Sequence, residues 1–339
     1  MSRRSWGLVL TATLAVGVAL SACSSSDSGP SVPSSDLGKA LAQVTAGKSL
    51  PDIEFGRPAA ILTADGGKQT GPYSRAGGYG TGELASYATI TPGALGFNAL
   101  QATWAVTAGE PPRSGTLLAG LPSLSSVGAK STALGATKHT SGSQTVYRFR
   151  ADNAVSLSDR LAKAFSGGLS PNVLSVDGSD LRVARAVAGL DLVSGGDPTL
   201  AGDKAYTALA RCLDDPLAAM LTASIPKPTR QTPATTTPPT PGVRAVAVGL
   251  SGSQGVRPTE QLCVAADTGK HATDIAASIR KALASGRSHQ ANEPWTDLLS
   301  NVSVSTSGSL VTVTAHPKQS VGGVLLTALA NADLPGLSG

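Results

Sequence analysis

The chain has 339 residues, of which 27 are basic and 22 acidic, and only 4% are aromatic. No stretch concentrates lysine and arginine together with aromatic residues, which excludes the usual pattern of a nucleic-acid-binding surface, so we expect no nucleic-acid partner. A chain of this length can form two modest hydrophobic cores.

The first 23 residues have the pattern of a bacterial export signal. Two arginines at residues 3–4 precede an apolar run at residues 6–20, which is short for a membrane-spanning helix. Residues 20–23, Leu-Ser-Ala-Cys, follow this run and resemble the lipobox of the bacterial lipoprotein family. The resemblance implies that residues 1–22 are removed as a signal peptide and that Cys23 takes a thioether-linked diacylglycerol.

Lipidation at Cys23 determines the expected location of the protein. Two acyl chains give stable membrane attachment, whereas one is marginal. We therefore expect a lipid-anchored protein on the extracytoplasmic face of the bacterial cell membrane. The alternative is an ordinary cleaved signal in which Cys23 is an incidental residue.

Residues 23–49 are predicted to be the lipidated cysteine and a flexible tether. Serine, glycine and proline dominate residues 24–36, so this segment cannot bury enough apolar surface to fold. Asp36 can cap a short helix that ends near Gly47. Further on, the sequence predicts strands at residues 59–62, 102–107 and 116–119 and a glycine-rich loop at residues 66–82.

The remaining chain shows the same order of four predicted elements twice: strand, helix, β-hairpin and helix. The first copy comprises residues 145–149, 157–165, 173–183 and 198–213, and the second comprises residues 261–264, 275–283, 302–313 and 321–332. The two hairpins turn at residues 177–179 and 307–309. Internal duplication is one interpretation of this pattern, and chance similarity between two α+β segments is the other.

The predicted fold class is α+β. The helices of the repeat each carry one apolar stripe, which predicts two similar lobes, each an antiparallel sheet with helices packed on one face. The lobes are expected at residues 50–225 and 243–339. A Pro/Thr-rich linker at residues 226–242 separates them, because frequent proline prevents helix and sheet.

Cys212 and Cys263 are the cysteines that remain after the lipobox. An exported chain reaches an oxidising compartment, so one disulfide is the simplest prediction. Two buried free thiols are the alternative. A metal site is not expected, since neither cysteine has a CxxC or HxxxH partner.

Motifs that carry chemistry are not found in the sequence. His139, His271, His289 and His316 are not paired at metal-ligand spacing. We therefore expect no catalytic residue, no metal and no cofactor. Trp104 is predicted to lie in the core, whereas Trp295 is either packed onto the core or an exposed contact.

The lipobox, the tether, the cysteine pair and residues 95–112 resemble uncharacterised actinobacterial cell-envelope lipoproteins, a resemblance that implies a location but no activity. Our leading hypothesis is a non-enzymatic binding protein that holds a hydrophobic or cell-envelope ligand between its helices and sheet. The alternative is a structural module that docks an envelope or membrane-protein partner through an exposed patch around Trp295 or residues 71–82. A third hypothesis is an enzyme whose site residues are widely scattered.

Overall fold

The computed structural model describes residues 34–68, 70–141, 144–165, 171–225 and 239–338, which belong to one compact unit, Val32–Gly339. The predicted signal peptide, Cys23 and residues 226–238 of the expected linker lie outside the described residues.

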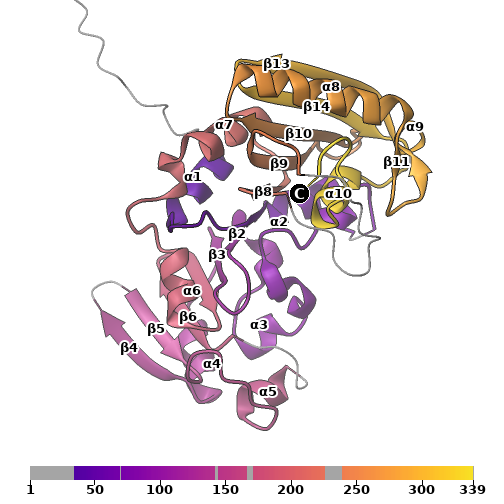
Figure 1. Ribbon diagram of the computed structural model, residues 1–339. Coiled ribbons are helices and arrows are strands. Elements are labelled where there is room, and N and C mark those ends of the chain that lie inside the picture. Colours follow the sequence, from indigo (N-terminus) through magenta and orange to yellow (C-terminus); the bar gives the residue numbers. More distant parts are fainter. Residues whose placement is uncertain (1–33, 69, 142–143, 166–170, 226–238, 339) are drawn as a thin grey trace, which may run out of the picture. The chain divides into compact units, whose positions relative to one another are not determined.

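The described residues form one antiparallel sheet of twelve strands (Figure 1). In chain order the strands are β1 (Ile53–Gly56), β2 (Trp104–Ala108), β3 (Gly115–Ala119), β4 (Thr137–Ser141), β5 (Gln144–Arg148), β6 (Val173–Asp177), β7 (Asp180–Ala184), β8 (Ala218–Thr222), β9 (Val243–Ser251), β10 (Thr259–Ala266), β13 (Leu299–Ser307) and β14 (Leu310–Pro317). Their order in the sheet is β13-β14-β10-β9-β8-β1-β2-β3-β7-β6-β5-β4. A separate small ribbon pairs β11 (Arg287–Ser288) with β12 (Glu293–Pro294).

Helices lie on both faces of this sheet. They are α1 (Asp36–Gln43), α2 (Pro58–Ala64), α3 (Thr91–Ala94), α4 (Val127–Ala133), α5 (Arg160–Ala164), α6 (Val187–Leu192), α7 (Lys204–Leu213), α8 (Gly269–Ser285), α9 (Trp295–Leu298) and α10 (Val324–Ala330). Short 3-10 helices span Ser74–Ala76, Gly82–Tyr87, Ala99–Gln101 and Leu200–Gly202.

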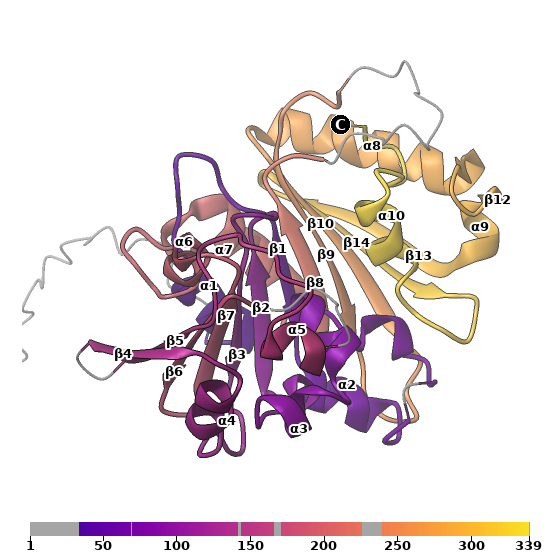
Figure 2. The ribbon, with the colours of Figure 1, turned by 90° about the horizontal axis from the view of Figure 1, so that it is seen from below.

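One face of the sheet, which we call the cluster face, carries two separate apolar cores. The first core packs α2, α8, α9 and α10 against β8, β9, β10, β13 and β14, and Figure 2 shows α8 and α10 beside these strands. The second core packs α4, α5 and the 3-10 helix Gly82–Tyr87 against β2, β3 and β5 to β7. On the opposite face, α1 and α7 cover the strands at the centre of the sheet.

The two similar lobes expected from sequence do not each have their own sheet, because β1 pairs with β8 and joins the twelve strands into one sheet. The expectation of helices on one face only is likewise wrong. The reason is that the central strands bury apolar side chains on both faces. Phe55 and Leu221 contribute to the core under α1 and α7, while Val248 and Leu262 contribute to a core on the cluster face.

Two local expectations also need correction. The predicted strand at residues 59–62 is part of helix α2, which begins at Pro58, a residue well suited to the first turn of a helix. The predicted tether ends earlier than residue 49. Ser35 caps α1, and Leu37 and Leu41 on this helix are fully buried in the core.

The predicted disulfide between Cys212 and Cys263 is confirmed. It joins the last turn of α7 to β10, and both cysteines lie in the core on the face covered by α1 and α7. The bond therefore ties the central strands to the helix that precedes β8 in the chain.

A single row of directly paired residues crosses all twelve strands on the cluster face. In sheet order it consists of Val304, Val313, Leu262, Val248, Met220, Glu54, Thr107, Thr116, Val183, Leu174, Tyr147 and Lys138. Directly paired residues of antiparallel strands point to the same face. The row is apolar over each of the two cores and polar between them, at Glu54, Thr107 and Thr116.

Candidate functional site

The polar centre of this row forms the floor of the candidate site. Thr107 lies on β2 and donates a hydrogen bond from its hydroxyl to the Gly80 carbonyl oxygen (3.0 Å). The Thr107 and Thr116 hydroxyls lie 2.8 Å apart and share a second hydrogen bond. Glu54 lies on β1 beside Thr107, and no hydrogen bond or ion pair links its carboxylate to another described residue.

The glycine-rich segment predicted as a loop packs directly onto this floor. A Cβ atom added to Gly56 would lie 2.1 Å from the Tyr79 carbonyl oxygen, and one added to Gly80 would lie 2.3 Å from the Ala105 carbonyl oxygen. Gly80 also has a φ of +75°, which glycine adopts at little cost. The backbone can therefore approach the sheet closely, and this approach positions the 3-10 helix Gly82–Tyr87 above the sheet.

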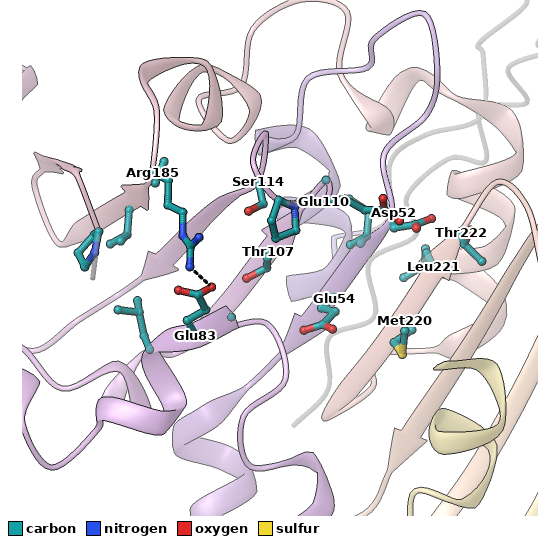
Figure 3. Close-up of a pocket in the computed structure, with 18 of the residues that line it drawn as sticks. Asp52, Glu54, Glu83, Thr107, Glu110, Ser114, Arg185, Met220, Leu221 and Thr222 are labelled. Atoms are coloured by element: carbon teal, nitrogen blue, oxygen red, sulfur yellow. Dashed lines mark hydrogen bonds and ion pairs between the residues drawn. The ribbon is translucent and has the colours of Figure 1, made fainter. Parts of the chain in front are cut away.

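A cavity of about 540 Å³ opens between this 3-10 helix and the strand ends (Figure 3). Its floor includes Glu54, Thr107 and Met220. Its apolar walls come from the 3-10 helix, β7 and α10, and include Leu84, Tyr87, Val183 and Leu329. The volume is within the range of small-molecule binding sites.

The charged groups around the cavity are mostly acidic. Figure 3 shows Asp52, Glu54, Glu83 and Glu110 together with one cation, Arg185, whose guanidinium is 2.6 Å from the Glu83 carboxylate. The ion pair leaves the other three carboxylates without a cationic partner among the described residues. Asp52, Glu83 and Glu110 are exposed at the rim, whereas Glu54 is partly buried on the floor.

Burial changes the protonation chemistry of the floor. The pKa of Glu54 is raised because burial disfavours its charged form. Burial also raises the pKa of Tyr79 to about 12, and the nearby carboxylates of Glu54 and Glu260 add to this shift. Glu54 is thus the one acidic group of the cavity that is both partly buried and left without a partner in the described chain.

A second buried carboxylate holds α10 in place at the cavity wall. Glu260 on β10 is 1% exposed and accepts hydrogen bonds from the backbone amides of Gly323 (2.8 Å), Val324 (2.9 Å) and Leu325 (2.6 Å). These amides have no partner within the helix, and the carboxylate accepts their hydrogen bonds. Its negative charge also lies at the positive end of the helix dipole, which stabilises the helix. Leu329, near the other end of α10, reaches the cavity.

The tryptophans and histidines that the sequence singles out do not line this cavity. Trp104 and Trp295 are buried in different cores, so Trp295 packs onto the core and is not an exposed contact. His271 pairs with Asp267 (2.5 Å), and the His316 ring lies 2.9 Å from the Pro258 carbonyl oxygen. Across the described ranges, no group of His, Cys, Asp and Glu side chains could hold a metal ion, and no helix is long and apolar enough to cross a membrane.

Sequence reasoning missed the residues that the cavity brings together, because they come from separate segments that range from Asp52 to Leu329. One local signal was present. Glu54 stands between Ile53 and Phe55 in a short apolar stretch, where a charged residue is unusual for a strand with neighbours on both sides. Glu110 precedes Pro111 and Pro112, but nothing in the sequence connects it to Glu54.

Comparisons with protein-family models, with curated proteins and with solved structures find no match to this chain. The function must therefore be argued from the site alone.

Proposed function

We propose that this chain is an extracytoplasmic binding protein, anchored to the membrane by lipid on Cys23, that holds a small amphiphilic ligand without chemical turnover. The observation that carries the proposal is the 540 Å³ cavity between the two apolar cores, with its apolar walls and few polar groups. Binding sites commonly combine a largely apolar wall with a small number of polar groups that orient the ligand.

The sheet order supports an internal duplication as part of this proposal. Taken outward from the central pair, five strands follow the same plan in each half: β1-β2-β3-β7-β6 and β8-β9-β10-β14-β13. The hairpins β6–β7 and β13–β14 both turn at a glycine with a left-handed φ, Gly178 (+59°) and Gly308 (+58°). In both hairpins the pair that belongs to the cross-sheet row lies three residues from the pair that closes the turn. The row pair is Leu174–Val183 in the first hairpin and Val304–Val313 in the second.

This correspondence differs from the one suggested by sequence. The counterpart of β10 is β3, and β4, β5 and α5 are then an insertion in the first half. The reason is the pairing partner. β10 pairs with β14, the second strand of the β13–β14 hairpin, and β3 pairs with β7, the second strand of the β6–β7 hairpin. β5 pairs instead with β6, the first strand of that hairpin. The proposed halves meet at the Glu54–Met220 pair, beside the cavity.

Two measurements test the proposal. Cys23→Ser should abolish the incorporation of a labelled fatty acid into the chain in a bacterial host, and labelling that survives this substitution would count against the lipid anchor on Cys23. Native mass spectrometry of the chain from residue 23 onward, with Cys23→Ser, should then show a copurifying small molecule that denaturation releases. Glu110→Trp adds a bulky side chain at the exposed rim of the cavity, so it should reduce this adduct while the thermal unfolding midpoint stays unchanged.

A further inference from the structure

We infer that the ligand of the cavity carries a cationic head group, a protonated amine in the simplest case, on an apolar body. This inference rests on the proposed function and specifies the chemical class of the ligand for that same site. It excludes fatty acids and other anionic amphiphiles as the preferred ligand.

The first argument is the charge around the cavity. Four carboxylates and one guanidinium line the cavity, and the guanidinium is already paired with Glu83. The whole chain has the opposite balance, with 27 basic and 22 acidic residues. An acidic site on a basic chain is a local feature, and a recessed site lined by one sign of charge attracts ligands of the other sign.

The second argument is the position of Glu54. The carboxylates at the rim are exposed, and exposed ion pairs contribute little because water and salt screen them. Glu54 is partly buried on the floor, next to the apolar side chain of Met220. A cation that reaches Glu54 would therefore form a charge-assisted hydrogen bond in a less polar setting, where such bonds are stronger.

The third argument is what occupies the matching positions of the other half. There, Met220, Val248 and Leu262 continue the row as apolar residues under α8 and α10. At the corresponding positions of the first half the row has Glu54, Thr107 and Thr116. The Thr107 hydroxyl donates to the Gly80 carbonyl oxygen and shares a hydrogen bond with the Thr116 hydroxyl. The Glu54 carboxylate is therefore the charged floor group that has no partner among the described residues.

The inference can be tested with three probes that share one apolar chain and differ in charge: octylamine, 1-octanol and octanoate. The protein is the chain from Cys23 onward with Cys23→Ser, which retains the whole compact unit Val32–Gly339. Isothermal titration calorimetry at neutral pH and low ionic strength, below micelle-forming concentrations, gives the three affinities. Octylamine should bind at least tenfold tighter than octanol, because hydrogen bonds to charged groups are stronger than neutral ones, and octanoate should bind more weakly than octanol.

Variants of Glu54 test whether its carboxylate causes the preference for octylamine over octanol. Glu54→Gln should remove about tenfold of the octylamine affinity and leave octanol binding unchanged, whereas Glu54→Asp keeps the charge and should keep part of the preference. Glu293→Gln is the matched control, because Glu293 is exposed on β12 and does not line the cavity.

The outcomes separate this inference from the proposed function. Equal binding of all three probes would overturn the cationic head group while leaving an apolar binding site. A preference for octylamine that survives Glu54→Gln would also overturn the inference, since the charge would then be recognised elsewhere. If none of the probes binds, both the inference and the proposed function are overturned.

Discussion

Replacing Glu54 by glutamine should stabilise the protein at neutral pH. Glu54 is partly buried, and its carboxylate has no hydrogen-bond or ionic partner among the described residues. Glutamine has nearly the same shape but no charge to desolvate. Burying an unpaired charge costs more than burying an unpaired amide, and because Glu54 is only partly buried we expect a gain of about 1 kcal/mol.

The pH dependence identifies the cause of this gain. Because burial raises the pKa of Glu54 in the folded chain, the folded state binds the proton more tightly than the unfolded chain does. The wild type therefore loses stability, relative to the Glu54→Gln variant, as the pH rises through the raised pKa. Below the ordinary pKa of glutamate both states are protonated, and the difference between the two proteins should be smallest.

Urea unfolding followed by tryptophan fluorescence measures this difference, since Trp104 and Trp295 are buried in different cores. Wild type, Glu54→Gln and the exposed control Glu293→Gln would be compared between pH 4 and pH 8. The reasoning is refuted if Glu54→Gln is less stable than wild type at pH 7.5, or if its gain in stability is the same at every pH. The first result would mean that the carboxylate has a stabilising partner in the folded chain, and the second would mean that the gain does not come from the ionisation of Glu54.

Three further predictions concern the framework of the site and are tested by the same unfolding assay. Replacing Cys212 and Cys263 by serine should cost about 4 kcal/mol, because the disulfide closes a loop with a sequence separation of 51 residues in the unfolded chain; a cost below about 1 kcal/mol under oxidising conditions would contradict this. Gly80→Ala should lower the free energy of unfolding by at least about 2 kcal/mol, since the residue has a left-handed φ and the added Cβ would clash with the backbone of the sheet. Gly178 also has a left-handed φ but has open space around it, so Gly178→Ala is the control and should cost only about 1 kcal/mol. Glu260→Ala should cost about 2 kcal/mol by leaving three amides of α10 without their acceptor, and an unchanged stability would show that water replaces the carboxylate.

Elements with a local signature could be predicted from the sequence. The hairpins at residues 177–179 and 307–309 turn at Gly178 and Gly308, which take the left-handed φ that glycine favours. Helices α7 and α8 show apolar residues at helical spacing. Only two cysteines follow the lipobox, so one disulfide between them was the simplest prediction. In each of these cases neighbouring residues, or the chemistry of the residue itself, contain the information.

The central strands could not be predicted in the same way. β1 has four residues and includes Glu54 and Gly56, which weaken the pattern of a buried strand. β8, with the sequence Ala-Ala-Met-Leu-Thr, follows the helix α7 closely and has no polar alternation to separate it from a helix end. Their pairing joins residues about 165 positions apart, and local pattern does not report such contacts. The single sheet and the cavity both depend on this pairing.

The composition of the cross-sheet row explains why the site lies in one half and not in the other. In the second half Val248 and Leu262 gain stability by burial under α8 and α10. Thr107, at the position that matches Val248 in the proposed duplication, gives up part of that gain, and Glu54 is expected to reduce stability because its carboxylate is partly buried without a partner among the described residues. Residues that break a local packing rule are expected at functional sites. Under the proposed duplication, the difference between the two halves therefore supports Glu54 as the residue that contacts the proposed ligand.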